Sequence, residues 1–586
     1  MVANATQICF KEVTMNKISK TISVLLVSCL CVAFAAGCSK PSEKIDATKT
    51  QVYVANYNGG VGTEWLEKVK IRFEEAYAES TDFEEGKKGV QVIIDPSQSY
   101  RDTANFSTLA ANKNYVFFTE AVNIDELMRQ NLLHDISGMM KENLPGESKT
   151  LESKLTDTHK KALTMRDGKY YAVPHYTIYN GVNYDINLFE ENGLFISKES
   201  VPGDTIFLPA KADASRRSAG PDGDPATASD NGLPETLDQF IDLCDEMVKK
   251  QIVPFIWANG TSTKTYKNFL GNAFAFNALG PELTKMLTSY DSNGEEIEYI
   301  KNFSGNQPEY AKAAITPENG YLLKQHPAIY ETLEFLKKVY DKFETYFSNL
   351  CKYDTYDNLS AQRDYIYSNT ANGNSGQGNS SYPIAMLVEG TYWVNESESN
   401  EFFANSGVAA TERNFGFMPM PTGGSVAGKY NTSRGFTAVD TYSSYAFINK
   451  KVESNPVALK IAEEFLKFCY TDVSLQEFTV TTNIPKGVNY AMPDDRLSKL
   501  TSYGKSLWEI KDSGNVVYDI SDSKFFTYNW SDLTFTNFFT THSGTEYTVF
   551  WDGLNGDGAA KKYFEGLWYS GDDGKKDWKN YLSKLS

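Results

Sequence analysis

Apolar and polar residues alternate along the chain in short segments that predict strands separated by helices. The stretch "QVYVANY" (51–57) has the period of two that a half-buried strand shows, and residues 63–79 carry apolar side chains at helical spacing from Trp65 to Tyr77. Two further strand-like runs, "VQVIIDP" and "YVFFTEA", come before the helical pattern "NIDELMRQN". This order predicts an α/β fold with short connections.

The length of the chain predicts more than one hydrophobic core. It has 586 residues, and single cores rarely grow past about 250 to 300 residues, so we expect two lobes or more. Two stretches rich in small, polar and glycine residues interrupt the pattern. Residues 209–233 are interpreted as a surface insertion and residues 370–381 as a flexible loop.

The N-terminal region has the pattern of an export signal. From Met15 the chain carries two lysines, then fifteen mostly apolar residues, then "AAGC". An apolar run this short favours a cleaved signal peptide over a membrane span, which needs about 20 residues. The junction resembles the lipobox of bacterial lipoproteins. We therefore expect Met15 as the true start, a signal peptide at 1–37, lipid on Cys38 and a linker at 38–49; the alternative is a secreted protein in which Cys38 has no role.

The charge and the cysteines exclude several classes of partner. Acidic residues outnumber basic ones by 75 to 57, which gives a net charge of −18. Phosphate backbones are bound by clustered Lys and Arg, so nucleic acid is excluded. The cysteines have no metal-ligand spacing, and no metal is expected. Cys244 and Cys469 fall in helical apolar patterns that favour buried thiols, although one disulfide among these two and Cys351 stays open.

The turn "NGGVG" (58–62), between the first strand and the first helix, raises the question of a nucleotide. It lacks the G-x-G-x-x-G order, and no Lys-Ser/Thr follows it as a Walker loop requires. A nucleotide is therefore excluded, and no cofactor is expected. The glycines either only permit the turn or belong to a binding site, because ligands of α/β folds bind beyond the carboxyl ends of strands.

Seven segments, taken in order, resemble a known family. They are "YNGGVGTEWLEKVKIRFEE" with "FEEGKKGVQVII", "VFFTEAVNIDELMRQNLLHDIS", "DGKYYAVPHYTIYNGVNYDINLFEENGL", "PETLDQFIDLCDEMVKKQIVPF", "AMLVEGTYWVNE", "FGFMPMPTGG", and "YAFINKKVESNPVALKIAEEFLKFCYTDVSLQEF" leading to "TNIPKG". Over residues 51–487 the chain resembles the family 1 extracellular solute-binding lipoproteins of sugar ABC importers, the group that includes maltose-binding protein.

The resemblance implies a fold and a function. The fold is a two-lobed α/β periplasmic-binding-protein fold of type II, with a ligand cleft between lobes joined by crossing strands. Lobe one would comprise residues 50–165 and 414–485, and lobe two residues 166–413 and 486–586. The protein would be an extracytoplasmic monomer, lipid-anchored to a bacterial cell membrane, that binds a carbohydrate, in particular an oligosaccharide, and delivers it to ABC transporter permease subunits without catalysing a reaction.

Sugar binding requires flat aromatic faces and polar groups that hydrogen-bond to hydroxyls. Glu120 follows a strand, where its carboxylate can accept hydrogen bonds from vicinal hydroxyls. The segment "GTYWVNE" resembles the family's G-x-W element with one residue inserted, so either Tyr392 or Trp393 could stack on sugar, and Trp393 is favoured. Tyr176 lies at the expected first crossing, next to a His175 interpreted as structural.

The remaining candidates lie in loops that match cleft segments of the family or follow strands. Trp257 ends a strand in "PFIWANG", where stacking on a ligand and packing in the core are equally open. The other candidates are Asn58, Gly60, Arg434 and Asn483.

Two other classes of protein remain as alternatives. A lipid-anchored glycoside hydrolase would need two carboxylates about 5 to 9.5 Å apart, and no such pair can be placed from the sequence. No G-x-S-x-G or H-E-x-x-H motif is present. The stretch "DGLNGDG" (552–558) departs from the EF-hand pattern and is interpreted as a turn. A peptide-binding surface lipoprotein is the third class.

Overall fold

The computed structural model describes residues 44–583 apart from residues 102, 107–108, 261–265, 267, 370–381, 422–435, 442–443, 514, 519–552, 568–574, 577 and 581. The elements below belong to one unit, within residues 48–586. The predicted signal peptide, Cys38 and the loop predicted at 370–381 lie outside the described residues.

The first of two main sheets has five strands in the order β2-β1-β3-β12-β4. β1 runs parallel to β2 and β3, whereas β12 is antiparallel to β3 and to β4. The strands predicted at the start of the chain are confirmed. The bounds are β1 Thr50–Tyr57, β2 Val90–Ser97, β3 Val116–Glu120, β12 Ser444–Ile448 and β4 Val173–Pro174.

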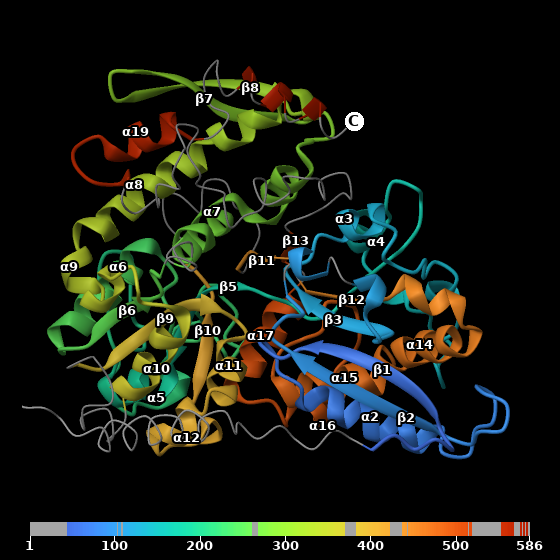
Figure 1. Ribbon diagram of the computed structural model, residues 1–586. Coiled ribbons are helices and arrows are strands. Elements are labelled where there is room, and N and C mark those ends of the chain that lie inside the picture. Colours follow the sequence, from blue (N-terminus) through green and yellow to red (C-terminus); the bar gives the residue numbers. More distant parts are fainter. Residues whose placement is uncertain are drawn as a thin grey trace, which may run out of the picture. The chain divides into compact units, whose positions relative to one another are not determined.

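Helices from both ends of the sequence cover this sheet. α2 (Glu64–Ala76) packs on β2 and α14 (Pro456–Cys469) on β1, while α15 (Asp472–Thr482) packs on α2 (Figure 1). The Phe73 ring of α2 lies edge-on to Phe465 of α14, with 5.0 Å between ring centroids. Side chains far apart in the sequence therefore form one core.

The second main sheet has four strands in the order β10-β5-β9-β6. β5 is antiparallel to β9 and β10, and β6 is parallel to β9. All seven residues of β9 are buried. The strands are β10 Phe415–Met418, β5 Asn180–Asp185, β9 Ile384–Gly390 and β6 Val253–Trp257. The helices that contact them are α6 Leu237–Lys249, α7 Asn268–Ser289, α10 Asn358–Ser368 and α17 Ser502–Asp512.

Two separate sheets, each covered by helices, fit the two-lobed α/β fold expected from the sequence. The chain passes from one sheet to the other three times: at 175–179, between β10 and β12, and after α15. The first and third passages lie side by side, because Tyr176 bridges to Lys486 and the Thr177 N–H donates to the Pro485 carbonyl at 3.0 Å. The sheets do not change at the expected lobe boundaries of 165/166 and 413/414. β4, after the first boundary, still belongs to the first sheet, and β10, after the second boundary, still belongs to the second sheet.

Smaller elements complete the second half of the chain. α19 packs on α8 beside the β7-β8 hairpin (Figure 1), and α17 packs on β10, so these described parts of the C-terminal tail contact elements of the second half. Bounds of these elements are β7 Glu296–Ser304, β8 Gln307–Ala314, α8 Pro327–Asp341, α19 Ala559–Glu565, β11 Ala438–Asp440 and β13 Val516–Tyr518. Other helices are α3 Ile124–Arg129, α4 Asp157–Leu163, α5 Ile186–Asn192, α9 Phe343–Tyr346, α11 Trp393–Ser399, α12 Phe402–Ser406 and α16 Asp494–Leu497.

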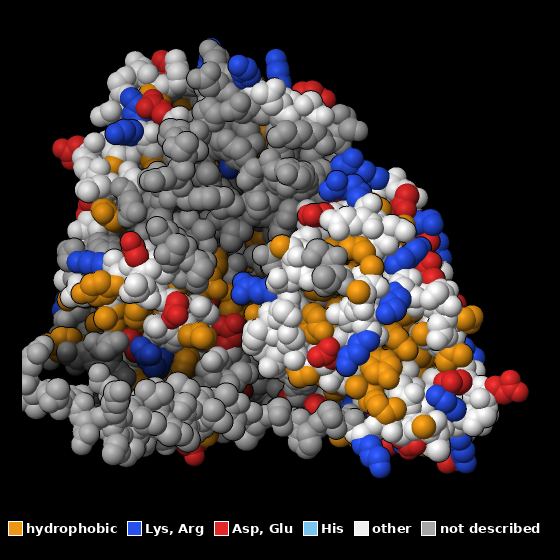
Figure 2. Space-filling model, viewed as in Figure 1, with side chains coloured by type: hydrophobic (Ala, Val, Ile, Leu, Met, Phe, Trp, Pro, Cys, Tyr) orange, Lys and Arg blue, Asp and Glu red, His pale blue; other side chains and the backbone are white. Residues whose placement is uncertain are grey.

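Several expectations from composition can be compared with the structure. Cys244, Cys351 and Cys469 are buried, and no disulfide joins any of these three residues. Within the described ranges, no helix has the length and apolarity needed to cross a bilayer, and no group of three metal-ligating side chains is found. On the face that Figure 2 shows, Lys and Arg are interspersed with Asp and Glu over the coloured residues, so these residues form no continuous basic track there.

A lysine lies fully buried at the third passage, among aromatic rings of the first half. Lys486 Nζ is 4.6 Å from the ring centroid of Phe478 and 4.8 Å from that of Trp65, and His175 Nδ1 accepts its hydrogen bond at 2.8 Å. No carboxylate among the described residues pairs with it. Burial lowers the pKa of Lys486 from 10.5 to about 7.

This buried lysine makes stability depend on pH. Because the pKa of Lys486 is lower in the folded chain, only the unfolded chain keeps the Lys486 proton between about pH 7 and 10.5. In this range the contribution of Lys486 to the unfolding free energy therefore rises with pH, by at most about 1.4 kcal/mol per pH unit. Lys486→Met should remove that rise, measured by denaturant unfolding at pH 7, 8 and 9. Lys505→Met, at an exposed site on α17, is the control. Equal slopes in wild type and Lys486→Met would refute the assignment.

Candidate functional site

The loop after β1 brings backbone close to the end of β3. Inside it, Asn56 Nδ2 donates to the carbonyls of Tyr57 at 2.8 Å and Gly62 at 3.0 Å, which fixes the turn. Asn58 is exposed, and its Oδ1 accepts from the Thr63 hydroxyl at 2.8 Å. The turn before α2 is therefore held by side chains of its own residues.

Gly60 is the point of closest approach. Its φ of +53° lies in the left-handed region, and a Cβ placed there would collide with Glu120 Oε1 and with the Tyr176 hydroxyl. Both of these side chains were predicted for the site, and both are buried. The glycine therefore has a steric role in the cluster in addition to permitting the turn.

Two polar atoms beside Gly60 have unmet hydrogen-bonding capacity. Glu120 is 8% exposed and its Oε1 has no hydrogen-bond partner in the part of the chain that the structure describes. The Tyr176 hydroxyl is also buried and unpartnered within that part. Native proteins satisfy nearly all such groups, so an exception in a cluster indicates a site that a ligand completes.

The second half of the chain contributes the facing groups. Tyr392 immediately precedes α11, and its hydroxyl lies 3.0 Å from that of Tyr266. Glu389 is the penultimate residue of β9, and its Oε1 accepts from the Gly390 N–H at 2.9 Å, while its Oε2 is buried and makes no hydrogen bond of standard geometry among the described residues. The Asn180 Oδ1, near the ring of Tyr392, is likewise unpartnered there.

Glu396 links the two halves. It lies one helical turn after Tyr392, and its Oε2 accepts hydrogen bonds from Gln362 Nε2 at 2.9 Å and Asn358 Nδ2 at 3.2 Å. The backbone of Gly60, from the other half, also hydrogen-bonds to this carboxylate. Burial raises the pKa of Glu396, and these hydrogen bonds oppose the rise.

The cluster has more acidic than basic groups. Burial raises the pKa of Glu120 to about 8 against the opposing effect of Arg101, and burial raises the pKa of Glu389 well above its ordinary value. The Arg101 guanidinium lies 6.0 Å from the ring centroid of Tyr57. Among the described residues here, three carboxyls share one guanidinium. Most of the unpartnered atoms are acceptors, so the cluster suits a ligand rich in hydrogen-bond donors.

The other predicted residues lie elsewhere. Trp393 is fully buried, with Phe415 edge-on at 4.9 Å and Tyr365 at 5.5 Å, so its ring packs in the core of the second half and offers no free face. Trp257 is also fully buried, 4.1 Å from Phe347. The favoured position therefore moves from Trp393 to Tyr392.

Asn483 lies away from the Gly60 cluster. Asn483 ends α15 in the left-handed conformation, and its Oδ1 accepts from the N–H and the hydroxyl of Thr501, both at 2.9 Å. It lines a separate cavity of about 280 Å³ with Tyr503 and Arg413. Arg434 lies outside the described residues.

Sequence reasoning missed five members of the cluster. Glu389 lies near the carboxyl end of a strand, as Glu120 does, and Glu396 lies four residues after Tyr392 on one helix face, so both had a signal. Tyr57, Arg101 and Tyr266 come from segments with no pattern that distinguishes them from neighbouring residues.

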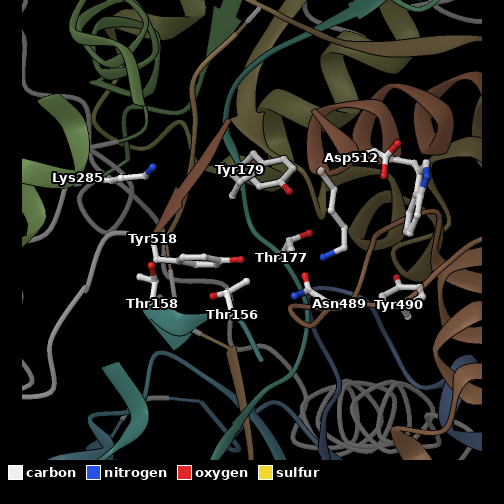
Figure 3. Close-up of a pocket in the computed structure, with 12 residues that line it drawn as sticks. Thr156, Thr158, Thr177, Tyr179, Lys285, Asn489, Tyr490, Asp512 and Tyr518 are labelled. Carbon is white, nitrogen blue, oxygen red and sulfur yellow. The ribbon is translucent and has the colours of Figure 1, made fainter. Parts of the chain in front are cut away.

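A second cavity, of about 400 Å³, lies on the other side of the first passage. Figure 3 shows side chains of Thr177 and Tyr179 around it, together with Thr156, Asn489 and Tyr518. None of its lining residues was predicted for the site.

The comparison with known families identifies the class of protein. The family model described as bacterial extracellular solute-binding protein matches residues 69–474. The chain belongs to this family. It is therefore a solute-binding protein that acts outside the cytoplasm, and the resemblance inferred from its segments is confirmed. A search of curated proteins finds no match to this solute-binding protein.

Solved structures of similar fold share little sequence with this solute-binding protein. A chitin oligosaccharide binding protein is 15% identical, with a TM-score of 0.47 and coverage of 89% of this chain and 99% of that one. The protein RafE in complex with raffinose is 13% identical (TM-score 0.45; 89% and 99%). A cyclic alpha-maltosyl-1,6-maltose binding protein from Arthrobacter globiformis is 11% identical (TM-score 0.49; 92% and 100%).

The steric role of Gly60 can be tested with a matched glycine. Gly86 also has positive φ (+79°), but no atom lies within 4 Å of a Cβ placed there. Gly86→Ala should cost only the left-handed conformation, about 1 kcal/mol of unfolding free energy. Gly60→Ala should cost at least about 1 kcal/mol more, because overpacking adds to it. Denaturant unfolding of both variants measures the difference; equal losses would show that Glu120 and Tyr176 do not approach this backbone.

Proposed function

We propose that this solute-binding protein captures a carbohydrate, in particular an oligosaccharide, and delivers it to the permease subunits of an ABC transporter. The observation that carries the proposal is the cluster of Gly60, Glu120, Tyr176, Glu389 and Tyr392. Its acceptors are buried and unpartnered within the described residues, and they come from both halves of the chain. Sugars supply many hydroxyl donors, which can bond to these acceptors, together with flat C–H faces, which can pack on the ring of Tyr392.

The names of similar structures give weaker support. A chitin oligosaccharide binding protein and RafE bound to raffinose have related folds at low sequence identity. Within the cluster, each side chain has a different role in the proposal. Tyr392 provides a ring, Glu120 and Glu389 accept hydrogen bonds from hydroxyls, and Arg101 partly balances their charge. Asn58 lies on the exposed edge of the loop, where it would contact an extended ligand.

Replacing each of the two neighbouring aromatic residues by alanine tests the site. Tyr392→Ala should weaken carbohydrate binding about fivefold to over a hundredfold, the effect of about 1 to 3 kcal/mol from a lost ring contact, and leave the fold intact. Trp393→Ala should instead lower the unfolding free energy by about 3 to 5 kcal/mol, because it empties a core position. A thermal-shift screen of oligosaccharides finds the ligand, and calorimetry and denaturation then separate the two effects. Full binding by a folded Tyr392→Ala protein would exclude this site.

A glycoside hydrolase is the second candidate, because Glu120, Glu389 and Glu396 are buried carboxyls in one cluster. A carboxyl with a pKa of about 8, as Glu120 has, would be protonated at neutral pH as a general acid is. The family description names binding proteins and favours capture without cleavage. Chromatography after prolonged incubation of the bound oligosaccharide with purified protein distinguishes them, since only a hydrolase yields shortened sugars.

Lipid anchoring through Cys38 completes the proposal, and it rests on the leader pattern and the "AAGC" junction. A surface tether keeps the protein near its permease, and stable attachment takes more than one acyl chain. Mass spectrometry of the mature protein should find Cys38 as the N-terminal residue with diacylglycerol mass added. Cys38→Ser should release the protein from the membrane fraction. An unmodified Cys38 in the mature chain would contradict anchoring.

A further inference from the structure

The cavity of about 400 Å³ is separate from the candidate site and large enough for a small molecule, since ligand pockets span about 300 to 1,000 Å³. Extended chain alternates its side chains between two faces. Tyr176 faces Gly60 and Glu120, whereas Thr177 and Tyr179 line this cavity. The two sites therefore lie on opposite faces of one passage.

The walls of the cavity carry several hydroxyl and ammonium groups that can donate hydrogen bonds. Tyr179 is 1% exposed, and its hydroxyl makes no hydrogen bond of standard geometry within the described residues. In Figure 3 this hydroxyl and that of Tyr518 point toward the side chains of Thr177 and Asn489. A ligand with acceptor atoms can therefore use the donors of this wall.

Lys511 of α17 provides a positive charge in this wall. Lys511 Nζ lies 5.6 Å from the ring centroid of Tyr490, and no carboxylate among the described residues forms an ion pair with it. Burial lowers its pKa to about 8, although Asp440 and Asp512 oppose this. An anion beside this ammonium would restore the charge balance lost on burial. Lys285, which also lines the cavity, is already paired with Glu282 at 2.8 Å.

Aromatic rings and an acid complete the wall. Tyr490 and Trp508 lie edge to face with 5.3 Å between centroids, which gives an apolar surface for a ring-shaped ligand. Asp512 is exposed, and its carboxylate can accept hydrogen bonds from hydroxyls of a ligand at the mouth. The wall thus combines a buried ammonium, a ring surface and an outer acceptor.

We propose that this cavity is a second binding site that takes a small hydroxylated carboxylate, such as a sugar acid. The carboxylate would accept hydrogen bonds from Lys511 and Tyr179, the ring would pack on Tyr490 and Trp508, and the hydroxyls would donate to Asp512. This site does not depend on carbohydrate binding at the Glu120 cluster.

Calorimetry with D-glucuronate as the probe tests the proposal on the full mature chain. Lys511 lines this cavity and lies outside the Glu120 cluster, so a loss of binding on its substitution reports the second cavity. Glucuronate should bind saturably, Lys511→Met should weaken it at least tenfold, and Lys505→Met, exposed on the same helix, should leave it unchanged. Circular dichroism checks the folding of each variant.

Tyr179→Phe is a second variant that keeps the test valid if Lys511→Met does not fold, and it should weaken binding at least threefold. Glucose and inorganic phosphate are the comparison ligands, and both should bind at least tenfold more weakly than glucuronate. The proposal is overturned if glucuronate does not bind, if folded variants bind it as wild type does, or if either comparison ligand binds as tightly.

Discussion

The pairing of the first and third passages between the two sheets is the constraint on which the binding cluster depends. The Thr177 N–H and its hydroxyl both donate to the Pro485 carbonyl, at 3.0 and 3.1 Å, and Tyr176 bridges to Lys486. These contacts fix the rotation of the passage about its own axis. The Tyr176 hydroxyl consequently meets Gly60 and Glu120, and Lys486 is placed among the rings of the first core.

The same region combines secure backbone pairing with groups that folding leaves unsatisfied. Glu120, Tyr176 and Glu389 each have a buried polar atom that no described residue bonds, although such atoms usually cost about 1 to 3 kcal/mol each. The surrounding core compensates for that cost. Trp393 shows how: its fully buried ring anchors α11 in the second half, and the helix in turn holds Tyr392 and Glu396 toward Gly60.

Sequence patterns predicted what depends on local periodicity. The strand ahead of Gly60 and the strand that ends at Glu120 were located correctly, because both alternate or run apolar and then stop at polar residues. The choice between Tyr392 and Trp393 was not decidable, since neighbouring residues at a helix start differ by about 100° in direction and only the packing of the second core selects one of them. Arg101 reaches the cluster from a loop without periodicity.

The burial of Lys486 could not be predicted from the sequence either. Lys486 in "IPKG" has no neighbour in sequence that indicates burial, because its cage is assembled from Trp65, Phe118, Tyr470 and Phe478, which lie in separate segments. The lobe boundaries differ from strand membership on similar grounds. β10 joins the second sheet by pairing with β5, more than two hundred residues earlier, and no local pattern encodes that partner.

The alternation of side chains along residues 176–179 also bears on how such a protein can change over evolutionary time. Substitutions at Tyr176 alter one face of the passage, and substitutions at Thr177 or Tyr179 alter the other, so the two faces can diverge separately. Inserting or deleting a single residue here would exchange the faces and break the pairing to Pro485. Ligand preference can therefore drift through point changes in this passage, while its length is fixed.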